Sequence, residues 1–202
     1  MILNFSKDYI LENESVKLLP LQAFHIKELV EVSQDESIWK YFLEKGNGID
    51  NLTKYIANTV NNRNSGREYT FAIYDKIKNQ YAGTTRFYDY SADIQTIKLG
   101  HTWIGKDFQG TGLNKNCKYL LFEFAFEKLN IERVGFGAHA DNKLSIAAMK
   151  SVGCKDEGVL RNFIPSLNRK GRADIVLLSI LKDEWFNSVK IELKHKLINT
   201  KT

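Results

Sequence analysis

A segment with two near-adjacent glycines, Gln109-Gly110-Thr111-Gly112-Leu113-Asn114, constrains the possible folds more than any other part of the chain. It stands between a strand-like run that ends at Ile104 and an amphipathic run over 112–128. Glycine reaches positive φ at little cost, so the backbone can turn sharply there and come close to a ligand. A helix that begins near Gly112 directs its unpaired N–H groups and its positive dipole end into the loop. The segment therefore predicts a strand–loop–helix unit that binds phosphate.

Two common phosphate-binding motifs do not match this loop. The P-loop requires G-x-x-x-x-G-K-[ST], and neither Gly110 nor Gly112 is followed by Lys-Ser or Lys-Thr. The dinucleotide fingerprint G-x-G-x-x-G requires a third glycine where Lys115 stands, and it normally lies near the first strand of a βαβ unit. This loop lies past the midpoint of the 202-residue chain. The two glycines could also be simple turn residues, a reading that the surrounding pattern disfavours.

The hydrophobic periodicity predicts alternating strands and helices in one domain, residues 1–202, with its core at about 15–185, a size within the usual range for single domains. The best predicted helix, 112–128, carries an apolar stripe suited to packing on a sheet. Its members are Leu113, Cys117, Leu120, Leu121 and Phe124. The other predicted helices are 22–32, 50–63, 142–152 and 183–197. The predicted strands are 16–21, 69–75, 81–88, 95–104, 131–138, 154–162 and 172–181, with a hairpin turn at 168–171 before the last.

Membrane, secretion and metal signals are absent from the sequence. No apolar stretch is long enough to span a bilayer, and Met1–Tyr9 lacks a basic region followed by an apolar one. We therefore expect a cytoplasmic protein. Cys117 and Cys154 stand in apolar settings and are expected to be buried free thiols. The four histidines show no metal-ligand spacing, so no metal is predicted.

Four segments occur in the order of four motifs of one known family. The family loop Gln/Arg-x-x-Gly-x-Gly/Ala is matched by Gln109, Gly112 and, imperfectly, Asn114. Segment 100–104 is similar to the family's fourth strand, Asn142-x-x-Ser145 followed by Gly153 to its "Asn-x-x-Ser … Gly-Phe" segment, and 157–161 to its "Glu-Gly-x-x-Arg" strand. The chain thus resembles the GNAT acyl-CoA N-acyltransferases, in their RimJ/RimL-like branch. The strong similarity covers Leu99–Arg161, and a weaker one extends over about Val16–Trp185.

The resemblance implies an α/β (α+β) fold with a single mixed, mostly antiparallel, centrally splayed sheet flanked by helices. The two central strands, 95–104 and 131–138, would diverge at their ends. The pantetheine arm of acetyl-CoA would lie in that gap and pair with exposed backbone groups. Main-chain groups around Trp103 and Ile104 would hold the arm and the thioester, and an N–H of this strand would face the developing oxyanion.

By the same resemblance, the pyrophosphate of acetyl-CoA would rest on N–H groups of the glycine loop. The residues concerned are Gln109, Gly110, Thr111, Gly112, Leu113 and Asn114. Lys115 or Lys118 would be available to the nucleotide's phosphate. The net charge of +5 and the pI near 9.0 suit such a polyanionic ligand, so they need no nucleic-acid partner.

The catalytic groups are less fully specified by the sequence. Many family members protonate the departing thiolate with a Tyr, but alignment puts Met149 there, and a thioether has no proton to donate. The Ser145 hydroxyl could contact the sulfur instead. Asn142 could hold the pantetheine amide or simply cap its helix. His101 is a candidate base because its ordinary pKa is near neutrality, but strand alternation puts it beside Leu99 and Trp103, which favours packing or substrate lining.

The acceptor site is open to several interpretations. Asp89, Tyr90 and Glu157 could contact an amine, although Glu157 could instead pair with Arg161 on its own strand. A cluster of aromatic residues (Trp39, Tyr41 and Phe42) could line a pocket or belong to the core.

The predicted activity is acetyl transfer from acetyl-CoA to a primary amine, at a protein N-terminus or on a small molecule, by direct attack in a ternary complex. The alternative is a catalytically inactive CoA-binding regulatory or sensing protein of the same fold. A third, less favoured class binds nucleic acid through the basic stretch formed by Arg161, Arg169, Lys170 and Arg172. A homodimer through the late strands is compatible with all three.

Overall fold

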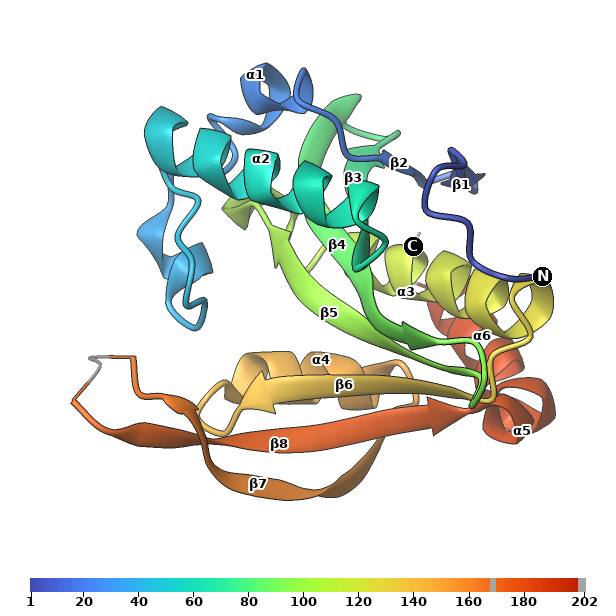
Figure 1. Cartoon of the computed structure of the whole chain (residues 1–202). Helices are drawn as coiled ribbons and strands as arrows, with labels where there is room; N and C mark the ends of the chain where they lie inside the picture. The colour runs from blue at the N-terminus through green and yellow to red at the C-terminus, as the bar shows by residue number, and fades with distance from the viewer. Residues whose placement is uncertain (168–169, 200–202) are drawn as a thin grey trace.

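The computed structural model describes residues 1–167 and 170–199 and contains one eight-stranded sheet (Figure 1). The strands lie in the order β1-β2-β3-β4-β5-β6-β8-β7. Their bounds are β1 Leu11–Glu12, β2 Val16–Pro20, β3 Glu68–Asp75, β4 Gln80–Ser91, β5 Thr96–Ile104, β6 Arg133–His139, β7 Lys155–Pro165 and β8 Arg172–Leu181.

The sheet opens at its centre. All neighbouring strands pair antiparallel except β5 and β6, which run parallel. Their pairing covers only Thr96–Lys98 against Arg133–Gly135, although β5 continues to Ile104 and β6 to His139. Figure 1 shows the two strands separating beyond this point. The predicted mixed, mostly antiparallel, centrally splayed sheet is confirmed.

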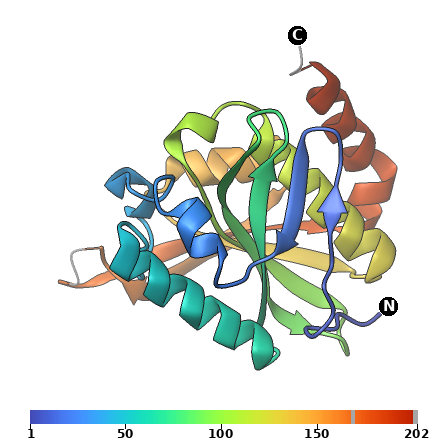
Figure 2. The same ribbon diagram turned by 90° about the horizontal axis from the view of Figure 1, so that it is seen from above.

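Helices cover both faces of the sheet (Figures 1 and 2). Helices α1 (His25–Leu29) and α2 (Ile49–Asn64), with the 3-10 turn Glu36–Trp39, form one core cluster that includes Trp39 and Trp103. The larger cluster lies on the other face and includes residues of α3 (Leu113–Glu123), α4 (Lys143–Ser151) and the C-terminal helices. The remaining helical segments are the 3-10 turn Lys106–Phe108, the π turn Phe124–Lys128, α5 Lys182–Glu184, the π turn Trp185–Val189 and α6 Lys190–Asn199.

The predicted helix 112–128 is confirmed except at its end, where it passes into the π turn. All five residues of its apolar stripe are buried. The predicted helix 22–32 is shorter, and the Ser33 hydroxyl bonds to the Val30 carbonyl just beyond it. Strand β1 and the turn Glu36–Trp39 carry no periodicity long enough to be detected in the sequence. The predicted hairpin turn 168–171 and the basic residue Arg169 lie wholly or partly outside the described residues.

Two further expectations have clear outcomes. Glu157 does not pair with Arg161: it forms an ion pair with Arg133 and accepts a 2.7 Å hydrogen bond from Ser179. The reason is an irregularity between Asp156 and Gly158, which breaks simple alternation along β7. Within residues 1–167 and 170–199, no helix is long and apolar enough to cross a membrane.

Candidate active site

The glycine loop joins the end of β5 to α3, and both of its glycines have the backbone that the sequence predicts. Gly110 has φ 76° and Gly112 has φ 86°, values that L side chains rarely adopt. Gly112 is the N-cap residue of α3 and has no side chain to cap the helix. The N-terminal N–H groups of α3 are therefore left for another acceptor.

Side chains of the loop hold it to the strand without using those N–H groups. Gln109 Nε2 donates to the Ile104 carbonyl at 2.9 Å, and the Thr111 hydroxyl donates to the Phe108 carbonyl at 2.8 Å. Among the described residues, the main-chain N–H groups of Gly110, Thr111, Gly112, Asn114 and Lys115 have no acceptor. These donors, at the positive end of a helix, form a cradle that suits a phosphate or pyrophosphate.

A bulge in β5 shapes the wall of the central opening. Arg86 pairs with Gly100 and Thr84 with Trp103, so His101 and Thr102 together face Thr85. His101 takes the left-handed φ of 46°. The predicted placement of His101 beside Leu99 and Trp103 is wrong, because the extra residue shifts the alternation. Leu99 packs in the α3-side cluster and Trp103 in the α2-side cluster.

His101 is exposed, and its ring lies 5.1 Å from the ring of Tyr88 in an edge-on contact. The surrounding protein lowers the pKa of His101 by desolvation, and the nearby Arg86 guanidinium lowers it further. Since the ring is still open to solvent, water limits the size of this effect, but the direction leaves the imidazole neutral near pH 7. A neutral ring can accept a proton.

The side chains of Trp103 and Ile104 are buried, so only their main-chain groups can meet a ligand in the opening. The carbonyl of Ile104 already accepts from Gln109. The sequence did not predict this contact, which uses the motif glutamine to fasten the loop to the strand.

Helix α4 borders the opening on the side of β6. Asn142 is its N-cap residue, and Asn142 Oδ1 accepts from the Ser145 N–H at 3.1 Å. The helix-cap interpretation of Asn142 is therefore confirmed, and its side-chain NH₂ remains available. The Ser145 hydroxyl is half-buried and has no hydrogen-bond partner among the described residues. Met149 is buried in the core.

Two residues proposed for the nucleotide's phosphate differ in access. Lys115 is half-exposed beside the cradle. Lys118 is only 4% exposed and directs its ammonium into the protein, where Nζ donates to Thr102 Oγ1 at 2.9 Å. The prediction that Lys118 is available to an external phosphate is therefore wrong, because the side chain lies between α3 and the sheet.

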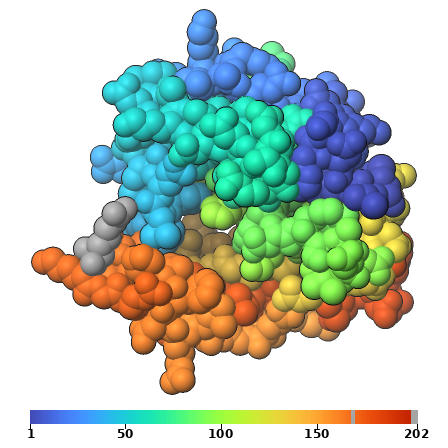
Figure 3. All heavy atoms as spheres, in the orientation of Figure 1, coloured from blue at the N-terminus to red at the C-terminus, as the bar shows by residue number. Residues whose placement is uncertain are grey.

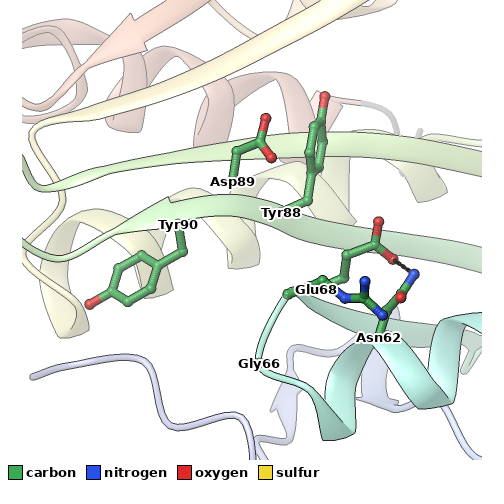
Figure 4. Close-up of a pocket in the computed structure, with 7 residues that line it drawn as sticks. Asn62, Gly66, Glu68, Tyr88, Asp89 and Tyr90 are labelled. Atoms are coloured by element: carbon green, nitrogen blue, oxygen red, sulfur yellow. Dashed lines mark hydrogen bonds between the residues drawn. The ribbon is translucent and has the colours of Figure 1, made fainter.

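The molecular surface is hollowed between the segment that contains α2 and the strand β7 (Figure 3). Beside α2, a pocket of about 490 Å³ includes Glu68, Tyr88, Asp89 and Tyr90 in its lining. Figure 4 shows Asp89 and Tyr88 on one strand and Glu68 on the next, with the Asn62 amide bonded to Glu68. Asp89 and Tyr90, both acceptor candidates, thus line one pocket. Trp39 belongs to the core, and Phe42 packs against it.

Within residues 1–167 and 170–199, no group of three or more His, Cys, Asp or Glu side chains could hold a metal ion. Cys117 and Cys154 are both buried and free. The site therefore consists of an anion cradle, an open strand edge and a carboxylate-bearing pocket.

Comparison with known proteins identifies this combination. Residues 15–155 match the family described as acetyltransferase (GNAT) domain, and the chain therefore belongs to the GNAT family and is an acetyltransferase. The predicted family and its RimJ/RimL-like branch are confirmed.

Three relatives illustrate the match. The Bacillus subtilis protein named "Putative ribosomal N-acetyltransferase YdaF" is 26% identical over 180 residues, which cover 86% of this chain and 94% of the relative. A crystal structure of an acetyltransferase from T. thermophilus has a TM-score of 0.82 and 28% identity, and covers 93% of this chain and 96% of that one. The microcin C7 self-immunity acetyltransferase MccE, solved with acetyl-CoA and AMP, shares the fold at a TM-score of 0.73 and 23% identity, covering 84% and 93% of the two chains.

Proposed function

We propose that the chain, acting as one catalytic domain, transfers the acetyl group of acetyl-CoA to a primary amine by direct attack in a ternary complex. The observation that carries this proposal is the set of free N–H groups in the glycine loop, which lies where β5 ends beside the central opening. The cradle suits the pyrophosphate, and the free edge of β5 suits an extended pantetheine arm.

The cosubstrate would be held mainly by main-chain groups. The pyrophosphate would accept from the loop formed by Gln109–Asn114, and the arm would run along the free edge of β5 at Trp103 and Ile104. Asn114 Oδ1 is buried without a hydrogen-bond partner among the described residues, so it could accept from an amide N–H of the arm. The use of acetyl-CoA is supported by family membership and by the acetyl-CoA complex of MccE.

The residues around the bulge would support the reaction by position and polarity. A main-chain N–H of β5 would face the carbonyl oxygen as it becomes negative. The Ser145 hydroxyl would donate a hydrogen bond at the sulfur end of the arm, and the neutral His101 would line the acceptor side and accept a proton from the amine. No covalent acyl-enzyme is required, since positioning can supply much of the rate enhancement.

The acceptor pocket favours a cationic amine. The carboxylates of Glu68 and Asp89 both line it, and carboxylates attract an ammonium group before it loses its proton. A protein N-terminus, and a ribosomal protein in particular, is supported by the name of the B. subtilis relative. The alternative of an inactive CoA-binding protein predicts binding without turnover of any amine.

The first test is the melting temperature with acetyl-CoA, with free CoA, ATP and NAD in parallel. Ligand at about a hundred times its Kd is expected to add about 2.7 kcal/mol to the free energy of unfolding. For a chain of this size each kcal/mol corresponds to about 2–4 °C. A shift only with the two CoA species supports the proposal. The absence of a shift with both, or a larger one with ATP or NAD, would refute it.

Replacing Asn142 with aspartate separates its two roles. Asp caps helices about as well as Asn, so the Asn142→Asp variant should keep its melting temperature within a few degrees. It lacks the NH₂ donor, so its affinity for CoA should fall about tenfold, the worth of one hydrogen bond of about 1.4 kcal/mol. Calorimetric titration with CoA measures the change. Unaltered affinity would restrict Asn142 to helix capping.

A further inference from the structure

Lys118 is the most unusual buried group in the described part of the chain. Its side chain projects from α3 onto the sheet and is 4% exposed. Nζ donates to Thr102 Oγ1 at 2.9 Å and approaches Thr85 Oγ1 at 3.5 Å, while the two hydroxyls lie 2.8 Å from one another. The Lys118 amine and two threonine hydroxyls thus form a small polar cluster within an otherwise apolar layer.

The charge of this ammonium is not balanced by the protein. No carboxylate of the described residues lies within ion-pair distance of Lys118. The titratable groups that influence it are the Cys117 thiol on its own helix and the Cys154 thiol at the junction of α4 and β7. Burial raises the pKa of each thiol to about 12, so both are neutral and supply no negative charge. An ammonium carries three N–H donors, and the two hydroxyls use at most two of them.

The cluster lies beside the central opening. Thr102 belongs to the stretch of β5 that has separated from β6, and it is one of the two bulge residues. Cys154 lies on the opposite side, after α4. An arm that pairs with the free edge of β5 lies about 4.8 Å from that strand. If it enters at the glycine loop and runs toward the closed end at Lys98 and Gly135, its sulfur end comes alongside Thr102, next to the Lys118 ammonium.

We propose that Lys118 is a catalytic residue that donates a hydrogen bond, and then a proton, to the sulfur of CoA as it leaves. This inference rests on the proposed function and extends it, because it supplies the acid that Met149 cannot. His101 and Lys118 would then act from opposite faces of β5, one toward the acceptor amine and the other toward the thioester.

The step balances without a further reactant. The amine nitrogen attacks the thioester carbonyl carbon, the C–N bond forms, and the C–S bond breaks with its electron pair on sulfur. The proton of Lys118 Nζ moves to the sulfur and leaves a neutral amine. The proton lost by the substrate nitrogen passes to His101 or water, and Lys118 regains one from solvent before the next cycle.

The protonation state of Lys118 suits this exchange. Burial lowers its pKa to about 8, and the thiols offset this only slightly. An ordinary thiol has a pKa of about 8.5, so a proton can pass between the two groups with little difference in free energy. A buried lysine that only filled space would need no such match.

The test measures the thiol of bound CoA, so it does not require the acceptor. The ultraviolet absorbance of the thiolate is recorded against pH for wild type, Lys118→Met and the control Lys128→Met, each saturated with CoA. Lys128 is exposed at the far end of the same helical run. In the wild type and the control, we expect the thiol pKa to lie about one unit below that of free CoA, a tenfold gain in thiolate. In Lys118→Met it should equal or exceed the value of free CoA.

Desulfo-CoA, which lacks the sulfur, supplies the second arm. Its affinity should be the same for the wild type and Lys118→Met, which shows that the variant keeps the binding site. Equal thiol pKa values in wild type and Lys118→Met would overturn the inference while leaving the proposed function intact. Failure of the wild type to bind CoA would instead overturn the proposed function. If Lys118→Met does not fold, a wild-type thiol pKa at or above that of free CoA is itself sufficient to overturn the role of Lys118.

Discussion

Replacing Gly112 with glutamate is expected to weaken CoA binding at least about 100-fold, which corresponds to about 2.7 kcal/mol. Two effects act together. Gly112 has φ 86°, where a Cβ atom costs about 1–2 kcal/mol per residue. The new carboxylate would also stand at the helix N-terminus that we assign to the pyrophosphate, and like charges at this distance repel strongly. Calorimetric titration with CoA measures the loss.

A matched variant separates backbone strain from charge. Gly112→Asn introduces a side chain that tolerates left-handed backbone better than most and adds no charge. Its affinity for CoA should stay within about tenfold of wild type, with the same unfolding midpoint within error. If Gly112→Glu binds CoA as tightly as Gly112→Asn, the glycine loop is not the phosphate site.

The parts of the fold that follow from local chemistry could be predicted from the sequence. The glycines need positive φ, and the stripe from Leu113 to Phe124 needs a sheet to pack on. Both requirements act over a few residues, so they can be read without knowing the rest of the chain. The order of motifs then added the central opening between β5 and β6, which is the feature that places the cradle beside a free strand edge.

The parts that depend on contacts between distant segments could not be predicted. The bulge at His101 is defined only against β4, where Thr85 faces two residues. Lys118 has no polar partner close to it in the sequence, and its hydroxyl partners come from 16 and 33 residues away on two other elements. Glu157 bonds to Arg133 across the sheet, not along its own strand. Strand alternation fails at each bulge because one added residue reverses every later side chain.

These distant contacts have a common consequence for the site. The bulge lets Leu99 and Thr102 both face α3, although they are an odd number of residues apart. Without it, Thr102 would face α2, and Lys118 would have no hydroxyl to bond. The same irregularity exposes His101 toward the acceptor side. One added residue in β5 thus sets the positions of both candidate acid–base groups.

The residue that fixes β4 beside this bulge is Arg86, and its loss should destabilise the protein severely. Arg86 is 6% exposed and donates to Glu68 at 2.6 Å and to the Tyr55 hydroxyl at 2.8 Å. It pairs with Gly100, the last residue before the bulge. In Arg86→Met the Glu68 carboxylate loses its cation while still largely buried, which costs about 3–5 kcal/mol. Urea unfolding, followed by circular dichroism, measures the change.

Two further variants show whether the cost comes from the orphaned carboxylate. Arg86→Met combined with Glu68→Leu replaces the whole ion pair by apolar groups and should recover most of the lost stability, because a buried pair is worth little against a well-packed apolar substitute. Lys98→Met breaks the exposed Lys98–Asp89 pair instead and should change stability by less than about 1 kcal/mol. A double variant no more stable than Arg86→Met would mean that Arg86 acts through its packing on β4. The acceptor pocket would then owe its shape to that packing, since Glu68 lines the pocket and is held there by the same guanidinium.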